Sequence, residues 1–505
     1  FDFRYIMKAV NGPSSYQNLR KADSLQSIDE GDDNDAPPGY SMSKAWVMLS
    51  ILLLLYSHNQ WVRSLIYCLV KFNVDDSEEN KRLYMNVDLE FDEGAYGVLA
   101  SFGFVLLYTV FCLFAGRASD IWDKKIINFV TSIIWSLAVV FQACVSSFGL
   151  VFLGRVMQGA AQAYTSPACI AMIADYFPSK GRATANAVFA AGLYVGFSLA
   201  SFVIPLDAAQ GWRLSTILVG VIGLCSSAVA AWVFWGINPP TITVFKTTVQ
   251  GRAGVIQEET GDGLLREQQQ SAAAPAPGPE DEPVLSTMDS LRVIFSNRAG
   301  VLMLLGSCVR ICSYYGITVW GPPWWRQNFP LYEMQFGVLN AFVVVGGGVC
   351  ASLAGGVISD AFVAREPRIR AWVPAFGCFL AVPLWMLAVS VKSFYWSIFF
   401  LLLEYLVAES WFGPFIATLQ DELPLNVQGM TQGLFGMAFA VGNCSPALMG
   451  VLAGTFPLQS VLFWSVSIFY VLAGVIFLAA SMCLRPPPAP MERIMKRKSS
   501  RISFG

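Results

Sequence analysis

Charged and titratable side chains are scarce in this chain of 505 residues. Asp, Glu, Lys and Arg make up 13% of the sequence, the formal net charge is −2, and His58 is the single histidine. So low a charge density excludes an ordinary water-soluble domain, and a nearly neutral chain is a poor partner for nucleic acid. A single histidine disfavours a histidine-based zinc site and histidine catalysis. We expect no cofactor, no metal and no enzymatic activity.

A disulfide framework is also missing from the sequence. The eleven cysteines fall inside apolar stretches rather than in loops, so they are expected to pack as small apolar side chains.

Long apolar runs are abundant instead. Hydrophobic residues make up 55% of the chain, and a bilayer core needs about 20 apolar residues per helix. On that basis the sequence predicts twelve spans, at residues 45–70, 94–115, 125–146, 149–173, 183–205, 213–236, 299–321, 335–358, 371–391, 395–418, 430–453 and 458–484. The expected fold is therefore an all-α multi-pass membrane protein with twelve transmembrane helices.

Two short motifs recur between the first and the last six spans. The pattern G-x-x-S-D occurs at 116–120 and again at 356–360, and D-x-x-P occurs at 175–178 and at 421–424. All four copies follow a long apolar stretch, so the chain reads as two similar six-helix halves joined head to tail. Duplicated membrane halves are typical of secondary transporters, which bind their substrate where the halves meet.

Composition divides the chain into five segments. They are an N-terminal tail, a first six-helix half, a linker, a second six-helix half and a basic tail, at residues 1–43, 44–237, 238–297, 298–484 and 485–505. The linker is polar and rich in Gln, Ala and Pro, which predicts a largely disordered segment. The first tail is polar and acid-rich, unlike a cleavable signal peptide.

The distribution of charge in the loops predicts the orientation. Lys and Arg gather in the short loops on the side of both termini, whereas the loop after the first span, at 75–93, is strongly acidic. Because cytosolic loops carry the excess of Lys and Arg, both tails and the linker are expected in the cytosol. The tails do not decide between an endolysosomal and a plasma membrane.

The loop at 116–125 resembles the signature loop between helices 2 and 3 of the major facilitator superfamily, and residues 154–159 are similar to a second pattern of that superfamily. Glycine lets two helices approach, and Asp120 can cap a neighbouring helix and pair with a cation. The resemblance implies a cytosolic gate formed by Gly116, Asp120, Lys124, Arg155, Asp175, Arg182, Asp360 and Arg365. The alternative is that these charges only set the topology.

Three further segments resemble the Spinster branch of the superfamily. They are residues 173–178, the W-x-P segment at 319–326, and the acidic helix-10 position Glu404 with Trp411 after it. The resemblance covers the transmembrane region but neither the tails nor the linker. It implies rocker-switch transport of an amphiphile such as a lysophospholipid or a sphingoid lipid.

The chain departs from the Spinster pattern at two carboxylates. Val62 stands where helix 1 of the family carries an Asp linked to ion coupling, and Gln162 stands where helix 4 usually has an acidic residue. Neither side chain can carry a proton, so transport down a gradient by a facilitator is one expectation. Glu404 and His58 are the remaining candidates for proton coupling.

Ionisable residues inside predicted spans are few, and a charge at mid-membrane usually faces a cavity and has a partner or a task. Steps of three or four residues place polar side chains on common faces of helices 1, 7 and 10. The predicted substrate-binding residues on these faces are Asn59, Arg63, Tyr67, Arg310, Tyr314, Glu404 and Trp411.

Two interpretations of Arg310 stay open. It forms a buried salt bridge with Glu404, or it faces a common cavity with Arg63 of the other half and holds an anion there, because a guanidinium donates in a planar fork and stays charged. Glu409 lies off the Glu404 face of helix 10, and it and Arg155 are alternatively structural groups near the rim.

Trp320, Trp324 and Trp325 are predicted to anchor the outer end of helix 7 at the membrane interface, in preference to gating an amphiphilic substrate. Glycines predict close helix packing in helices 5 and 11, at Gly192, Gly196, Gly433, Gly436 and Gly442. Prolines predict kinks in helices 4, 5, 10 and 11, at Pro167, Pro205, Pro414 and Pro446.

The function we expect is secondary transport of an amphiphilic organic anion of the lysophospholipid or sphingoid-lipid class, by a monomer surrounded by membrane lipids. A small carboxylate or phosphate ester would also satisfy the two arginines, which keeps a small organic-anion transporter open. The missing carboxylates keep a third possibility open, a non-transporting sensor or subunit of a membrane complex with protein partners.

Overall fold

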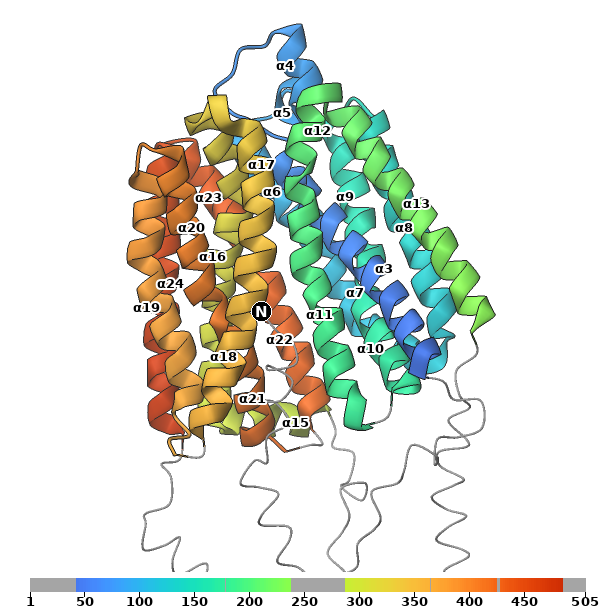
Figure 1. Cartoon of the computed structure of the whole chain (residues 1–505), viewed down its shortest axis with the longest axis vertical. Helices are drawn as coiled ribbons and strands as arrows, with labels where there is room; N and C mark the ends of the chain where they lie inside the picture. The colour runs from blue at the N-terminus through green and yellow to red at the C-terminus, as the bar shows by residue number, and fades with distance from the viewer. Residues whose placement is uncertain (1–41, 178, 238–286, 364, 425–426, 485–505) are drawn as a thin grey trace, which may run out of the picture. The chain divides into compact units, whose positions relative to one another are not determined.

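The computed structural model describes residues 42–177, 179–237, 287–363, 365–424 and 427–484 (Figure 1). The described residues from Ala45 onward belong to one compact unit. All regular elements in the described ranges are helices. Residues 1–41 of the N-terminal tail predicted at 1–43, the basic tail predicted at 485–505, and residues 238–286 of the predicted linker lie outside the described residues.

The first half consists of long helices and short helices that connect them. They are α3 (Met42–Cys68), α4 (Glu78–Leu83), α5 (Met85–Asp88), α6 (Glu93–Ala100), α7 (Phe102–Ile121), α8 (Lys124–Cys144), α9 (Phe148–Gln162), α10 (Thr165–Tyr176), α11 (Ser179–Ser201), α12 (Val203–Gln210) and α13 (Trp212–Gly236).

The second half begins with a short helix and is otherwise built in the same way. Its elements are α15 (Thr287–Ser296), α16 (Arg298–Asn328), η3 (Pro330–Tyr332), α17 (Glu333–Phe342), η4 (Val343–Gly347), α18 (Gly348–Val363), α19 (Ile369–Ser390), α20 (Phe394–Ala408), η5 (Glu409–Trp411), α21 (Phe412–Glu422), α22 (Gln428–Gly442), α23 (Ser445–Ala453) and α24 (Leu458–Cys483).

All twelve predicted spans are helical in the structure. Each coincides with one long helix or with two or three consecutive elements, and ten of these segments are long and apolar enough to cross a membrane. The other two spans are α3 and the pair α9 and α10. Their apolar runs are interrupted by polar side chains that bond to each other inside the first half.

The four predicted proline kinks are confirmed as breaks in helices. The helical hydrogen-bond pattern is interrupted a few residues before Pro167, Pro205, Pro414 and Pro446. The reason is steric, because a proline ring clashes with the carbonyl four residues earlier and has no N–H to offer it. These breaks separate α9 from α10, α11 from α12, α20 from α21, and α22 from α23.

Not every irregular segment has a proline beside it. The π-helical turn η4 lies between α17 and α18 and includes Gly346 and Gly347. Conversely, Pro322 and Pro323 lie inside the continuous helix α16, and Pro374 and Pro383 lie inside α19. A proline in the sequence therefore does not always break the helix that contains it.

Glycine positions in two helices differ in their surroundings. Gly192 and Gly196 of α11 lie against α3, and Gly442 of α22 lies against Ile311 of α16, so close packing is confirmed at these three positions. Around Gly433 and Gly436 there is open space, because an added Cβ would meet nothing within 4 Å. The packing prediction is wrong at these two residues of α22.

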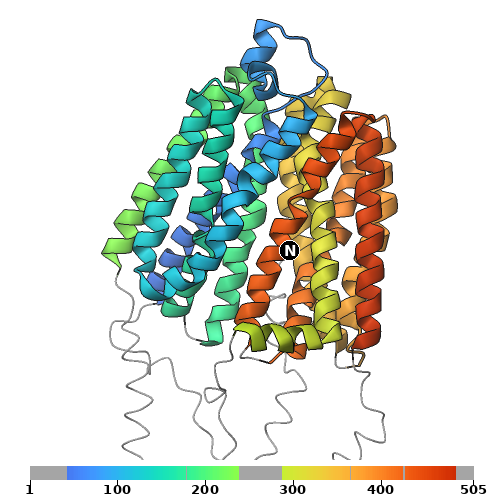
Figure 2. The ribbon, with the colours of Figure 1, turned by 180° about the vertical axis from the view of Figure 1, so that it is seen from behind.

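The ends of the long helices define two ends of the unit. We call the end that carries α4 and α5 the α4 end, and the opposite end, which carries α15, the α15 end (Figure 1). Helix α15 lies across the foot of the second half, against α16 and α22 (Figure 2). It occupies the last part of the predicted linker, so residues 287–296 are helical where the composition predicted a disordered segment.

Candidate functional site

Arg63 lies in the C-terminal part of α3 and is a cation without an acidic partner among the described residues. Its guanidinium carbon lies 4.1 Å from the centre of the Phe104 ring and 4.7 Å from that of Tyr108, both on α7. The side chain is only partly buried. Cation–π contacts of this kind contribute about 0.5–2 kcal/mol and leave the charge uncompensated. An anion that reaches Arg63 would therefore find a positive charge still available.

Arg155 of α9 is buried and holds α9 against α3. Its guanidinium donates to the carbonyl oxygens of Val62 (3.3 Å) and Arg63 (2.6 Å), and Gln158, one turn later, donates to the same Val62 oxygen at 3.0 Å. We predicted Arg155 at the cytosolic gate, and this placement is wrong, since its contacts lie within the first half at the level of Arg63. The spacing of three residues puts both polar side chains on the α9 face that packs on α3.

Asn59 belongs to the same contact between helices. Its side-chain amide donates to Thr165 Oγ1 at 3.0 Å, and Gln162 Nε2 donates to the Asn59 carbonyl oxygen at 3.0 Å. Gln162, which stands where the family usually has an acid, thus bonds to the backbone of α3. Asn59 is committed to Thr165 in this arrangement and is less available to a ligand than Arg63.

His58 is buried and both ring nitrogens have partners. Nδ1 accepts from Trp135 Nε1 at 3.1 Å, so the proton of the neutral ring lies on Nε2, which is 3.0 Å from the Val219 carbonyl oxygen. This tautomer is assigned from the hydrogen bonds. A second proton on Nδ1 would break the bond to Trp135. The geometry is that of a structural histidine joining α3, α8 and α13.

The second half balances its interior charge. Arg310 of α16 is 1% exposed and lies 2.9 Å from Glu409 Oε1, and it donates to the Ala408 carbonyl oxygen at 3.0 Å. Glu404 accepts instead from the Tyr470 hydroxyl of α24. The predicted pairing of Arg310 with Glu404 is wrong, and so is the placement of Glu409 near the rim.

The 3₁₀ turn η5 explains why Glu409 meets Arg310. Helix α20 ends at Ala408, and η5 carries Glu409, Ser410 and Trp411 before α21 begins. A 3₁₀ turn advances by about 120° per residue instead of about 100°, so side chains after Ala408 are rotated away from the positions that a straight helix predicts. Pro414, which cannot bond to the Ser410 carbonyl, favours this turn.

Several buried polar atoms of the second half have no hydrogen-bond partner. Those at the interior charges are Arg310 Nε and Nη1 and one oxygen, Oε2, of Glu404. Such atoms usually bind water or a ligand when they are buried. The described residues contain no group of three or more His, Cys, Asp or Glu side chains placed to hold a metal ion.

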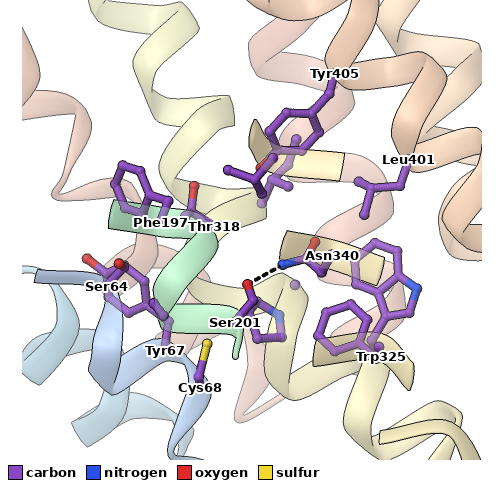
Figure 3. Close-up of a pocket in the computed structure, with 16 residues that line it drawn as sticks. Ser64, Tyr67, Cys68, Phe197, Ser201, Thr318, Trp325, Asn340, Leu401 and Tyr405 are labelled. Atoms are coloured by element: carbon purple, nitrogen blue, oxygen red, sulfur yellow. Dashed lines mark hydrogen bonds between the residues drawn. The ribbon is translucent and has the colours of Figure 1, made fainter. Parts of the chain in front are cut away.

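A pocket lies between the two halves on the α4 side of these charges (Figure 3). Its cavity volume is about 30 Å³, and it is lined mainly by α3, α11, α16, α17 and α20. Tyr67 contributes from the first half and Tyr405 from the second, and Asn340 donates to Ser201 Oγ across the halves at 2.8 Å. Apolar walls with a few polar groups are typical of ligand pockets.

Of the predicted substrate-binding residues, Tyr67 is the one that lines this pocket. Tyr314 contacts Phe197 of α11, with ring centres 5.7 Å apart, and Trp411 lies beside Arg310, 5.9 Å from its guanidinium. Sequence reasoning missed the small polar lining residues, Ser64, Ser201, Thr318 and Asn340. They carry no charge, so the search for intramembrane ionisable groups could not find them.

Contacts between the halves close the α4 end. Lys71, just after α3, forms an ion pair with Glu333 of α17, and the buried Arg326 of α16 donates to the Cys68 carbonyl oxygen of α3. Tyr96 of α6 donates to the Val319 carbonyl oxygen at 2.7 Å. These contacts join residues that the sequence analysis treated separately.

The three tryptophans of α16 are packed inside the protein and not at a membrane interface, and Trp320 takes part in this closure. Trp320, Trp324 and Trp325 are all buried, and Trp320 Nε1 donates to the Pro446 carbonyl oxygen at 3.0 Å. The Trp320 ring meets Tyr96 edge to face, with centroids 4.9 Å apart. The predicted anchoring role is therefore wrong, because the helix end that carries them packs against α6, α17 and α23.

At the α15 end, the ion pairs that the structure describes stay within one half. Lys124 Nζ lies 2.6 Å from Asp175 Oδ2 in the first half, and Arg370 pairs with Asp360 (3.8 Å) and Asp421 in the second. Asp360 thus meets Arg370 and not the predicted Arg365. The side chains of Gly116, Asp120 and Arg182 lie outside those described.

The sequence was compared with family models and with known proteins, and a family model matches most of it. The model of the Major Facilitator Superfamily matches residues 81–445. An "MFS-type efflux pump" of Mycolicibacterium smegmatis is 23% identical over 424 residues, which cover 83% of this chain and 87% of that protein. "Probable galactarate/D-glucarate transporter GudP" of Escherichia coli is 23% identical over 419 residues, which cover 78% and 87%.

A solved structure shares the fold. It is the bacterial homolog of the human lysosomal transporter Spinster, in an inward-facing and unoccupied conformation, with a TM-score of 0.64, 17% sequence identity, and coverage of 88% of this chain and 96% of that chain. The predicted Spinster-like resemblance is thus confirmed at the level of the fold. Since the family model covers well over half of the sequence and the long helices are apolar, this chain is an integral membrane protein that belongs to the Major Facilitator Superfamily.

Proposed function

We propose that this protein is a secondary transporter of small organic anions, carboxylates in particular, and that it works by alternating access. The observation that carries the proposal is Arg63, a partly buried arginine inside the first half with aromatic neighbours and no described carboxylate partner. A guanidinium in a low-dielectric interior attracts an anion that fits its planar fork. Arg310 is a weaker candidate than Arg63 for binding the anion, because Glu409 already compensates its charge.

The relatives support an anionic substrate. The name of the E. coli relative refers to galactarate and D-glucarate, which are both carboxylates. Nothing in that name refers to lipids. A small carboxylate is therefore the first candidate, ahead of the lysophospholipid or sphingoid lipid that the sequence resemblance implied.

The distribution of contacts supports alternating access. Ion pairs and hydrogen bonds join the two halves at the α4 end, whereas the described ion pairs of the α15 end stay within one half. The fold is also similar to that of a transporter homolog in an inward-facing conformation. We infer that the α15 end, which carries the basic loops, faces the cytosol.

An amphiphilic anion is the second candidate, and the pocket favours it. Phe197, Trp325 and Phe336 line the pocket that begins near Tyr67, so an apolar tail would find an aromatic wall there. A headgroup at Arg63 and a tail along this wall would use both features in a conformation in which the pocket is wider than in this structure.

The test is thermal stabilisation of the purified protein by a panel of sugar acids, monocarboxylates, lysolipids and neutral sugars. A ligand at 100 times its Kd stabilises the native state by about 2.7 kcal/mol. We expect carboxylates to raise the Tm of the wild type and of Arg63→Lys but not of Arg63→Ala. Equal effects of neutral sugars would contradict the proposal. No shift with any compound would favour the non-transporting alternative.

A further inference from the structure

The closure of the α4 end contains a buried carboxylate that the proposed function does not use. Asp207 lies on α12, in the first half, and its side chain is fully buried. Neither of its oxygens accepts a hydrogen bond of normal geometry, and the nearby Ser215 hydroxyl of α13 donates to the Gly211 carbonyl oxygen. The nearest cation is Arg326 of the second half, with Nη2 at 3.9 Å from Oδ2. A carboxylate in this position lacks the hydrogen bonds that normally compensate burial.

Arg326 directs its hydrogen bonds to other groups. Its Nε lies 3.3 Å from Glu333 Oε2, its Nη1 donates to the Cys68 carbonyl oxygen, and its guanidinium lies 4.9 Å from the centre of the Tyr84 ring. Glu333 in turn pairs with Lys71. The guanidinium is therefore shared, and Asp207 receives its attraction without a hydrogen bond.

The charged and titratable groups that face Asp207 come from several elements. They are Arg326 of α16, Glu333 of α17 and the Cys68 thiol of α3, and Arg82 of α4 lies beside Gly211, where α12 ends. Glu333 repels a negative charge on Asp207, whereas Arg326 attracts it. Burial and the missing hydrogen bonds add to the repulsion, and together these terms favour the neutral acid while the α4 end is closed.

We propose that Asp207 is a proton-binding site: closing the α4 end binds a proton to Asp207, and opening this end releases it. Opening removes the attraction of Arg326, because the two residues belong to different halves, but it also moves the repelling Glu333 away and admits water that solvates the carboxylate. The open form therefore has the lower affinity for the proton. This inference rests on the alternating-access part of the proposed function and is independent of the substrate.

The direction of the pH effect follows from linkage. Acid on the α4 side stabilises the closed form, and raising the pH there favours opening, by at most tenfold per pH unit because one proton is involved. The device also gives the chain a pH-sensitive carboxylate although Val62 and Gln162 stand at the two positions where the family usually has acids.

Three native cysteines allow the opening of the α4 end to be measured by chemical labelling. Cys68 is buried beside Arg326 and lines the pocket, Cys144 is exposed at the α4 end of α8, and Cys483 is exposed at the α15 end of α24. The full chain in sealed vesicles is treated with a membrane-impermeant maleimide at external pH 5.5 to 8, and peptide mass spectrometry measures the labelling of each cysteine. Cys144 and Cys483 show which end the reagent reaches.

For molecules whose α4 end faces the reagent, we expect the labelling of Cys68 relative to Cys144 to rise several-fold with pH in the wild type. In Asp207→Asn, which mimics the neutral acid, we expect slow labelling of Cys68 at every pH. Asp207→Glu should keep the pH dependence and shows that substitution at this position permits folding. Because Cys68 is the same thiol in every variant, its own reactivity cancels in the comparison.

Asp88→Asn is the matched control. Asp88 lies at the same end but bonds to Arg213 and Trp212 within the first half, so this variant should keep the pH dependence of the wild type. A pH dependence that survives in Asp207→Asn, or labelling that rises as the pH falls, would overturn the role of Asp207 alone. A Cys68 that is never labelled in the wild type would contradict alternating access itself.

Discussion

The interior arginines of the two halves differ in their partners. In the first half, Arg63 rests on aromatic rings and Arg155 donates to backbone carbonyls of α3, and within the described ranges neither meets a carboxylate. In the second half, Arg310 pairs with Glu409, and Glu404 lies close by on Tyr470. Two halves of one fold thus differ in charge: one offers an uncompensated cation, and the other is internally neutralised.

This comparison assigns different tasks to similar residues. A cation without an acidic partner is suited to bind an anion, whereas a buried pair chiefly holds helices together, and loss of one member leaves a bare charge behind. The same substitution in each half should therefore have different consequences for stability and for binding.

The largest effect should come from Arg310→Ala. This change leaves Glu409 without its partner and Glu404 with a second carboxylate nearby, so we expect the free energy of unfolding to fall by about 3–5 kcal/mol. Unfolding in mixed micelles of increasing SDS content measures the loss. The double variant Arg310→Met/Glu409→Gln should recover most of it, since replacing both members of a buried pair is often nearly neutral. A single variant as stable as the wild type would show that the pair contributes nothing.

Arg63→Ala should reverse the pattern. The free energy of unfolding should change by about 1 kcal/mol or less, because the side chain loses only its contacts with Phe104 and Tyr108. The affinity for a carboxylate should fall by about 10- to 100-fold, as expected for one lost hydrogen-bonded charge pair. Calorimetric titration with the best stabilising anion measures it. Equal stability losses in Arg63→Ala and Arg310→Ala would remove the difference between the halves.

The sequence predicted the parts of this molecule that depend on composition and proline. Apolar runs coincide with helices at all twelve predicted spans, ten of which are long and apolar enough to cross a membrane, and each of the four proline breaks follows from a missing N–H. Residue spacing also placed Arg63 on one helix face with Tyr67, which lines the pocket. These predictions require only local geometry.

Predictions that assume a straight helix or an exposed helix end were wrong. The turn η5 rotates Glu409 toward Arg310, which no count along an ideal helix can show. In the sequence the tryptophans of α16 resemble interface anchors, but in the structure neighbouring helices bury them. Asp207 and Arg326 are 119 positions apart, and their proximity depends on how the two halves pack.

Glu404→Gln should affect coupling more than stability. The amide can still accept from Tyr470, so the unfolding free energy should change by about 1 kcal/mol. If Glu404 carries the coupled proton, the variant should exchange labelled for unlabelled substrate across a vesicle membrane but should move no protons with it. A pH electrode measures the proton flux. Proton movement equal to that of the wild type would rule Glu404 out as the coupling group.

His58→Gln should have the smallest effect on proton flux and on substrate binding. His58 is titratable and lies inside the first half, so it competes with Glu404 as the source of proton movement. Its ring, however, accepts from Trp135 and contacts the Val219 carbonyl, and a glutamine amide has both an acceptor and donors to replace these bonds. We expect proton flux and Cys68 labelling to keep the wild-type pH dependence, with at most about 1–2 kcal/mol lost in stability. A lost proton flux in His58→Gln together with a normal flux in Glu404→Gln would place the coupling group in the first half, beside the arginine that we propose binds the anion.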